Sequence, residues 1–246
     1  MTAATPAPGA GPAQAVVFDL GGVLLDWDPR YLYRKLFDDE AAMERFLAQV
    51  CTPEWHAAHD RGVPFARSCA ALAARHPEQA DLIWAWGLRS EEMVAGPIDG
   101  TVEILRELRA RPVALYALTN MEAETYPVRR ERFDFLRWFD GTMVSSSEGV
   151  IKPDPEIFHR LLARFGLRAE TTLFIDDSAR NVEAARSLGI RSERFRSPEA
   201  LRSRLVAEGV LAACPERSDG ERVQPPAGAR GPIDVENERD DGPTLH

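Results

Sequence analysis

The chain has almost no lysine, little cysteine and no apolar run long enough to cross a membrane. Of its 30 basic residues, only Lys35 and Lys152 are lysines, and the 39 acidic residues give a net charge of −9. Proteins that bind nucleic acid or an anionic membrane depend on a cationic surface. We therefore expect a small-molecule substrate and neither nucleic acid nor a membrane as partner.

The three cysteines exclude two further classes of protein. Cys51, Cys69 and Cys214 are too few and too scattered for a disulfide framework, and they form no C-x-x-C metal site. The first residues lack the basic and apolar regions of a secretory signal. Together with an ordinary globular composition, this favours a cytoplasmic enzyme, and it leaves a monomer and a homodimer equally open.

The two ends of the chain differ in composition from the middle. Residues 1–14 are mostly Ala, Pro, Gly and Thr, which predicts a disordered leader. Residues 214–246 are acidic, contain several prolines and have few large apolar side chains, which predicts a disordered tail. A folded body is expected between them.

Short apolar segments alternate with amphipathic helical patterns in this body. The helical patterns start near Thr101, Pro155 and Ser178. The apolar segments do not alternate with polar residues, as expected for parallel strands covered on both faces. We therefore predict an α/β fold with a Rossmann-like parallel sheet, whose strands lie at 15–20, 113–118, 141–146, 171–177 and 190–195.

Residues 30–95 interrupt this alternation. They show no convincing strand, and four of their segments have helical patterns. An insertion directly after the first strand would lie over the carboxyl ends of the strands, where ligands of open α/β sheets bind. We therefore predict a helical cap at 30–95 and a core formed by 15–29 and 96–213.

Polar residues follow the ends of the predicted strands, and a parallel sheet would bring these ends together. Carboxylate oxygens bind Mg²⁺, an ammonium neutralises phosphoryl charge, and hydroxyl and amide groups donate hydrogen bonds to it. A carboxylate beside a metal ion can also accept a phosphoryl group as a nucleophile. The set comprises Asp19, Thr119, Asn120, Lys152, Asp176 and Asp177.

Four ordered motifs around these residues resemble those of the haloacid dehalogenase-like hydrolases. They read FDLGGVLLDWD, LTN, GVIKPDPEIF and FIDDSARNVEAARSLGI, and the resemblance spans roughly residues 15–196, with a helical cap in the expected place. Four motifs in order are far more specific than any one alone. The GGV and LLDWDPR segments are most similar to those of the branch that contains α-D-glucose-1-phosphate phosphatase and related sugar phosphatases.

The resemblance implies a role for each matching residue. Asp19 would be the nucleophile that forms an aspartyl-phosphate, and Lys152 would stabilise it and the transferring phosphate. Thr119 and Asn120 would hold the phosphoryl oxygens, and Asn181 would orient the aspartate pair. The implied cofactor is Mg²⁺, held by Asp19, the backbone carbonyl of Gly21, Asp176 and Asp177.

Gly21 departs from the usual phosphatase pattern, which has a second Asp there as general acid and base. General acid catalysis raises a reaction rate by about 10²–10⁴-fold. Its absence at position 21 leaves three alternatives: turnover is slow, the leaving group needs little protonation, or another group delivers the proton. The resembling sugar phosphatase branch also has glycine at this position. Candidate substitutes are Asp26, Asp28, His56, His59 and Asp60.

Three hypotheses for function follow. The first is Mg²⁺-dependent hydrolysis of small phosphomonoesters, sugar phosphates among them, with His56 and His59 as substrate contacts from the cap. The second is a hydrolytic 2-haloacid dehalogenase, which the paired acids Asp176 and Asp177 disfavour because that reaction needs no metal ion. The third is a phosphate-binding or regulatory protein whose chemistry is weak because of Gly21.

Overall fold

The computed structural model describes residues 11–212 of the chain. The predicted tail at 214–246 and the first ten residues of the predicted leader lie outside this range. The last leader residues differ from the expectation of disorder, because Ala13 is buried and the backbone of Gln14 bonds to Thr171 on one side and Ala114 on the other. These bonds continue the ladder of the first strand, so the ordered body begins before Ala15.

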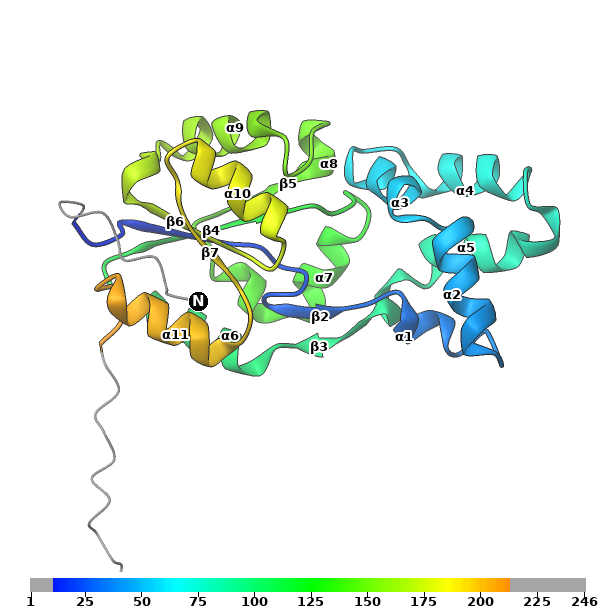
Figure 1. Ribbon diagram of the computed structural model, residues 1–246, viewed down its shortest axis with the longest axis horizontal. Coiled ribbons are helices and arrows are strands. Elements are labelled where there is room, and N and C mark those ends of the chain that lie inside the picture. Colours follow the sequence, from blue (N-terminus) through cyan, green and yellow to red (C-terminus); the bar gives the residue numbers. More distant parts are fainter. Residues whose placement is uncertain (1–10, 213–246) are drawn as a thin grey trace, which may run out of the picture. The chain divides into compact units, whose positions relative to one another are not determined.

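A five-stranded parallel sheet lies at the centre of the described residues (Figure 1). Its order is β5-β4-β1-β6-β7, and every neighbouring pair is parallel. This confirms the predicted α/β fold with a Rossmann-like sheet. The strands are β1 (Ala15–Phe18), β4 (Ala114–Thr119), β5 (Gly141–Val144), β6 (Thr172–Asp176) and β7 (Arg191–Arg194).

Helices cover the two faces of this sheet (Figure 1). The side chains of β1 alternate between the faces: Val16 and Phe18 pack in one apolar cluster and Val17 in another. The first cluster includes residues of α6 (Asp99–Arg109) and α11 (Pro198–Ala207). The second includes residues of α9 (Pro155–Phe165) and α10 (Ala179–Ser187). Burial on both faces explains why the strand segments are apolar throughout.

The predicted helix at Pro155 is confirmed, and its ends follow from local chemistry. The Asp154 side chain accepts a hydrogen bond from the backbone N–H of Glu156, and Gly166 ends the helix with a φ of 63°, which glycine adopts without steric cost. The remaining short elements of the core are α7 (Tyr126–Arg132), α8 (Ser145–Glu148), and the 3-10 turns η3 (Asp134–Arg137) and η4 (Ala169–Thr171).

Residues 30–93 form a helical insertion with its own apolar core, drawn in blue to cyan in Figure 1. Tyr33, Phe46 and Trp86 are among its buried side chains. No helix among residues 11–212 is long and apolar enough to span a membrane. The insertion comprises α1 (Arg30–Tyr33), α2 (Glu40–Gln49), α3 (Pro53–Asp60), α4 (Phe65–Ala73), η1 (Pro77–Gln79), α5 (Ala80–Leu88) and η2 (Ser90–Met93).

An antiparallel strand pair joins the insertion to the core, and the sequence analysis missed it. Strands β2 (Leu25–Trp27) and β3 (Val94–Pro97) pair on either side of the insertion. The predicted helical range of 30–95 therefore ends two residues too late. Segments of three and four residues are too short to show a periodic pattern of apolar residues. Whether they form strands depends on the strand with which they pair.

Two cysteines test whether the insertion holds a closed core. Burial raises the pKa of Cys51 to about 12 and that of Cys69 to about 11, and only the thiolate reacts quickly with alkylating agents. At pH 8 we expect iodoacetamide to leave both thiols unmodified in native protein and to modify both in urea, as measured by peptide mass spectrometry. Rapid labelling of either thiol in native protein would contradict a closed core.

Candidate active site

The carboxyl ends of β1, β4 and β6 bring distant polar residues together. Asp19 directly follows β1, and Thr119 and Asp176 are the last residues of β4 and β6. The register pairs Phe18 with Ala117 on one side and with Ile175 on the other. The sheet therefore brings these strand ends together, as the sequence predicts.

Lys152 lies at the centre of this group with a fully buried side chain. Its Nζ is 2.8 Å from Oδ2 of Asp19, 2.7 Å from Oδ2 of Asp176 and 2.9 Å from the carbonyl oxygen of Leu118. Three contacts match the three hydrogens of an ammonium. Burial lowers the pKa of Lys152, but the carboxylates of Asp176 and Asp19 outweigh burial and raise it, so the side chain is a cation.

Asn120 fixes the backbone of Lys152. Its Nδ2 donates to the carbonyl oxygen of Lys152 at 3.0 Å, and its Oδ1 accepts from the Lys152 backbone N–H at 2.9 Å. The family resemblance implies that Asn120 holds phosphoryl oxygens. The structure shows a further, positioning contact of Asn120 with the backbone of Lys152.

The aspartate pair after β6 contains one enclosed and one accessible carboxylate. Asp176 accepts hydrogen bonds from the Ser178 backbone N–H at 2.9 Å and from Nδ2 of Asn181 at 2.9 and 3.1 Å. Asn181 therefore contacts Asp176, the first member of the pair that it is predicted to orient. Asp177 is exposed. A Cβ at Gly22 would lie 2.6 Å from Oδ2 of Asp177, so glycine at position 22 lets the turn after Asp19 approach this carboxylate.

The three carboxylates of this group form a suitable set for a hard cation. Oxygens of Asp19, Asp176 and Asp177 lie within 4.8 Å of one another, and Mg²⁺ prefers such ligands. Burial raises the pKa of Asp19 to about 8, with Lys152 opposing and Asp176 adding to the rise. Partial desolvation and the neighbouring Asp176 raise the pKa of Asp177. Three carboxylates against one ammonium leave negative charge uncompensated, which adds to the rise of these pKa values, and a divalent cation would stabilise the ionised carboxylates.

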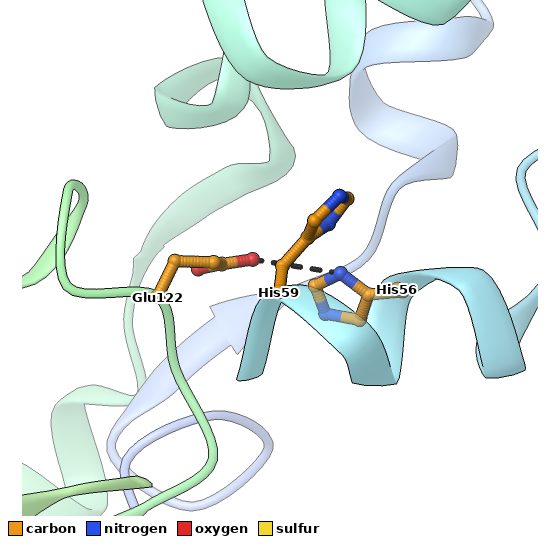
Figure 2. A group of neighbouring side chains, drawn as sticks. All are labelled: His56, His59 and Glu122. Carbon is orange, nitrogen blue, oxygen red and sulfur yellow. Dashed lines mark ion pairs between the residues drawn. The ribbon is translucent and has the colours of Figure 1, made fainter. Parts of the chain in front are cut away.

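The predicted substrate contacts His56 and His59 lie in a different group. Both are on α3, and together with Glu122 they form a second set of neighbouring ligand atoms (Figure 2). His59 is 1% exposed and packs edge-on against Trp55, with ring centroids 4.4 Å apart. Its burial does not suit a direct substrate contact.

The other candidate acids are held by local contacts. Asp26 accepts a hydrogen bond from the Tyr31 hydroxyl at 2.9 Å, and Asp28 accepts one from the Arg30 backbone N–H at 2.8 Å. Asp60 is buried, and its Oδ2 lies 3.8 Å from Nε2 of His56.

Two residues near the site were missed by the sequence analysis. Glu122 is buried two positions after Asn120, beyond the LTN motif, where a polar loop residue has no distinguishing pattern. Ser145 accepts a hydrogen bond from the Met121 backbone N–H at 3.1 Å and donates one to the carbonyl oxygen of Asp60 at 2.7 Å. Ser145 thus links the end of the insertion helix α3 to the loop that follows β4.

The two lysines of the chain provide a matched test of the buried cation. Replacing Lys152 with Met leaves two carboxylates buried without their partner, a change that typically costs about 3–5 kcal/mol. Lys35 makes an exposed ion pair with Glu92 at 2.9 Å, and solvent screens such pairs so that they contribute little to stability. We expect urea unfolding, followed by circular dichroism, to show a large loss for Lys152→Met and little change for Lys35→Met. Equal effects of the two variants would contradict this account of Lys152.

Comparison with known proteins places this site in a family. A family model described as a haloacid dehalogenase-like hydrolase matches residues 13–189. The sesquiterpene phosphatase astK of Aspergillus oryzae is 29% identical over 177 residues, which cover 72% of this chain and 87% of that protein. The phosphorylated carbohydrates phosphatase of Thermotoga maritima is 27% identical, with 72% and 82% covered. Two other curated relatives are much longer, and this chain spans 19% and 36% of their length.

Solved structures share the fold. The HAD family enzyme bt-2542 of Bacteroides thetaiotaomicron, in complex with magnesium and inorganic phosphate, aligns with a TM-score of 0.59 and 22% identity, covering 75% of this chain and 95% of that one. The L-2-haloacid dehalogenase of Xanthobacter autotrophicus aligns with a TM-score of 0.57 and 19% identity, covering 81% and 84%. The motifs, the sheet and the matched family model agree, and the chain belongs to the haloacid dehalogenase-like hydrolases.

Proposed function

We propose that this protein is a Mg²⁺-dependent hydrolase of small phosphomonoesters. The observation that carries the proposal is the buried ammonium of Lys152 between Asp19 and Asp176, next to the accessible carboxylate of Asp177. Transfer of a phosphoryl group requires positive charge around its oxygens. Lys152 supplies one cation, and the carboxylates could hold a metal ion as a second one. A hydrolytic dehalogenase would have no use for the acidic set, because its substrate carries no phosphoryl charge.

In this proposal Asp19 attacks phosphorus and forms an aspartyl-phosphate while the bond from phosphorus to the ester oxygen breaks, and the leaving oxygen takes its proton from water. Water then hydrolyses the acyl-phosphate and returns Asp19 to its starting state. Lys152 neutralises charge on the transferring group, and the Thr119 hydroxyl donates to a phosphoryl oxygen. Asp19, Asp177, Asp176 and the carbonyl of Gly21 would hold Mg²⁺, which would supply further charge neutralisation when bound.

The names of the relatives suggest a class of substrate, and the helical insertion suggests how water is excluded. Two curated relatives are named as phosphatases of a sesquiterpene and of phosphorylated carbohydrates, and a structural neighbour was solved with magnesium and phosphate. We propose sugar phosphates as the first substrates to test. The helical insertion would act as a cap over the strand ends that limits access of bulk water during phosphoryl transfer.

The glycine at position 21 limits which phosphate esters the proposed reaction can cleave quickly. The position lacks a general acid, and a Cβ built there meets no atom within 4 Å. The backbone at Gly21 also has no positive φ, so a side chain would fit without strain. The enzyme should therefore favour phosphate esters whose leaving group needs little protonation, such as anomeric sugar phosphates and aryl phosphates.

Asp19→Asn tests the nucleophile. The amide has nearly the same volume but is a poor nucleophile, so we expect phosphate release from an aryl phosphate to fall by at least about 10³-fold. The circular dichroism spectrum should be unchanged. Asp154→Asn is the matched control, because Asn caps α9 as well as Asp does and activity should persist. Substantial turnover by Asp19→Asn would overturn the proposed mechanism.

Gly21→Asp tests the missing general acid. An aspartic acid at this open position should raise the hydrolysis of an alkyl phosphate such as glucose 6-phosphate by about tenfold or more, and raise that of an aryl phosphate much less. Gly21→Asn fills the same space without a transferable carboxyl proton and should give no rise. If Gly21→Asp gives no rise with any alkyl phosphate, proton delivery is not what limits this enzyme.

A further inference from the structure

A second cluster of potential ligands lies where the helical insertion meets the core (Figure 2). His56 and His59 are three residues apart on α3, a spacing that places both rings on one side of a helix. Glu122 comes from the loop after β4 and points its carboxylate toward His56. One ligand atom from each of the three residues lies within 4.8 Å of the other two.

The cluster contains buried polar atoms without hydrogen-bond partners. Both ring nitrogens of His59, Nδ1 of His56 and Oδ1 of Asp60 accept or donate no hydrogen bond within residues 11–212. A buried polar atom without a hydrogen bond destabilises the folded state, so four in one place call for a common explanation. Burial also lowers the pKa of His59 to about 4, which keeps its imidazole in the neutral form that binds metal ions.

The surroundings hold these side chains in orientation. The His56 ring stacks on Trp27 with centroids 5.4 Å apart, and its Nδ1 lies 3.5 Å from Oε1 of Glu122. The Thr125 hydroxyl donates to Oε2 of Glu122 at 2.9 Å, so Oε1 is the oxygen left facing the imidazole. Metal sites use outer contacts of this kind to fix their ligands.

We propose that His56, His59 and Glu122 bind a divalent transition-metal ion, with Zn²⁺ as the best fit. Two imidazole nitrogens and one carboxylate oxygen are a known donor set for zinc with an open fourth position. Zinc ligands at about 2.0–2.1 Å stand about 3.3 Å apart in a tetrahedral site, so small side-chain rotations would complete it. The metal ion would tie α3 of the insertion to the loop after β4.

This site differs in chemistry from the carboxylate group around Asp19. That group offers only oxygen ligands, which suit Mg²⁺, whereas imidazole nitrogen selects zinc and its neighbours. The proposal is independent of the proposed phosphatase activity, since metal binding is measured without any substrate.

The test is a calorimetric titration of Zn²⁺ into the full-length chain, after EDTA treatment and dialysis into excess Mg²⁺. The excess magnesium competes with Zn²⁺ for the carboxylate group, and we expect one Zn²⁺ to bind per chain at the histidine cluster. His56→Gln and Glu122→Gln should each weaken binding by about 100-fold or more. His159→Gln, which changes an exposed histidine on α9, should bind Zn²⁺ as the unmodified chain does.

A thermal shift supplies a second readout, because a ligand that binds only the folded state raises its melting temperature. Zn²⁺ should raise the melting temperature of the unmodified chain and of His159→Gln, and should not raise that of a folded Glu122→Gln. Absence of one-to-one binding by the unmodified chain would overturn the proposal. If His56→Gln and Glu122→Gln bind Zn²⁺ as tightly as the unmodified chain does, the proposal is overturned as well.

Discussion

The buried ammonium of Lys152 is the interaction on which the rest of the site depends. It contacts groups from three strand ends: Asp19 after β1, the carbonyl of Leu118 in β4, and Asp176 at the end of β6. Without it, two carboxylates would share a buried space and repel each other. Burying an ammonium is itself unfavourable, and only satisfied contacts on all sides make it tolerable. Asn120 secures the backbone that delivers it.

The same arrangement explains why the site is suited to phosphate. The carboxylates outnumber the ammonium, which suits a divalent cation, and such a cation together with Lys152 would stabilise the negative charge of a phosphoryl group. Position 21 supplies no acidic side chain beside Asp19, since glycine leaves it open. The proposed reaction therefore combines strong charge stabilisation with weak help for the leaving group. The hydrogen bond from Ser145 to the carbonyl oxygen of Asp60 is one of the contacts that join the insertion to the core.

The sequence predicts the sheet and most of the residues around Asp19. It does not predict features that depend on strand pairing or tertiary packing. The segments around Phe18, Leu118 and Ile175 are apolar throughout, so their strands and the polar residues after them were readable. Strands β2 and β3 were missed because segments of three and four residues depend on each other for their conformation. Glu122 was missed because burial of a loop carboxylate is a tertiary effect. The buried state of His59 likewise depends on Trp55 and neighbouring helices, which no local pattern reveals.

The most direct test of the central claim is release of inorganic phosphate from a panel of phosphomonoesters, measured with Mg²⁺ and again with EDTA. The panel contains glucose 1-phosphate, glucose 6-phosphate, a nucleotide and an aryl phosphate, and halide release from 2-chloropropionate is measured in parallel. The account predicts turnover that requires Mg²⁺, with the anomeric and aryl phosphates hydrolysed fastest, and no halide release. Halide release that persists in EDTA, with no phosphate released from any member of the panel, would contradict it.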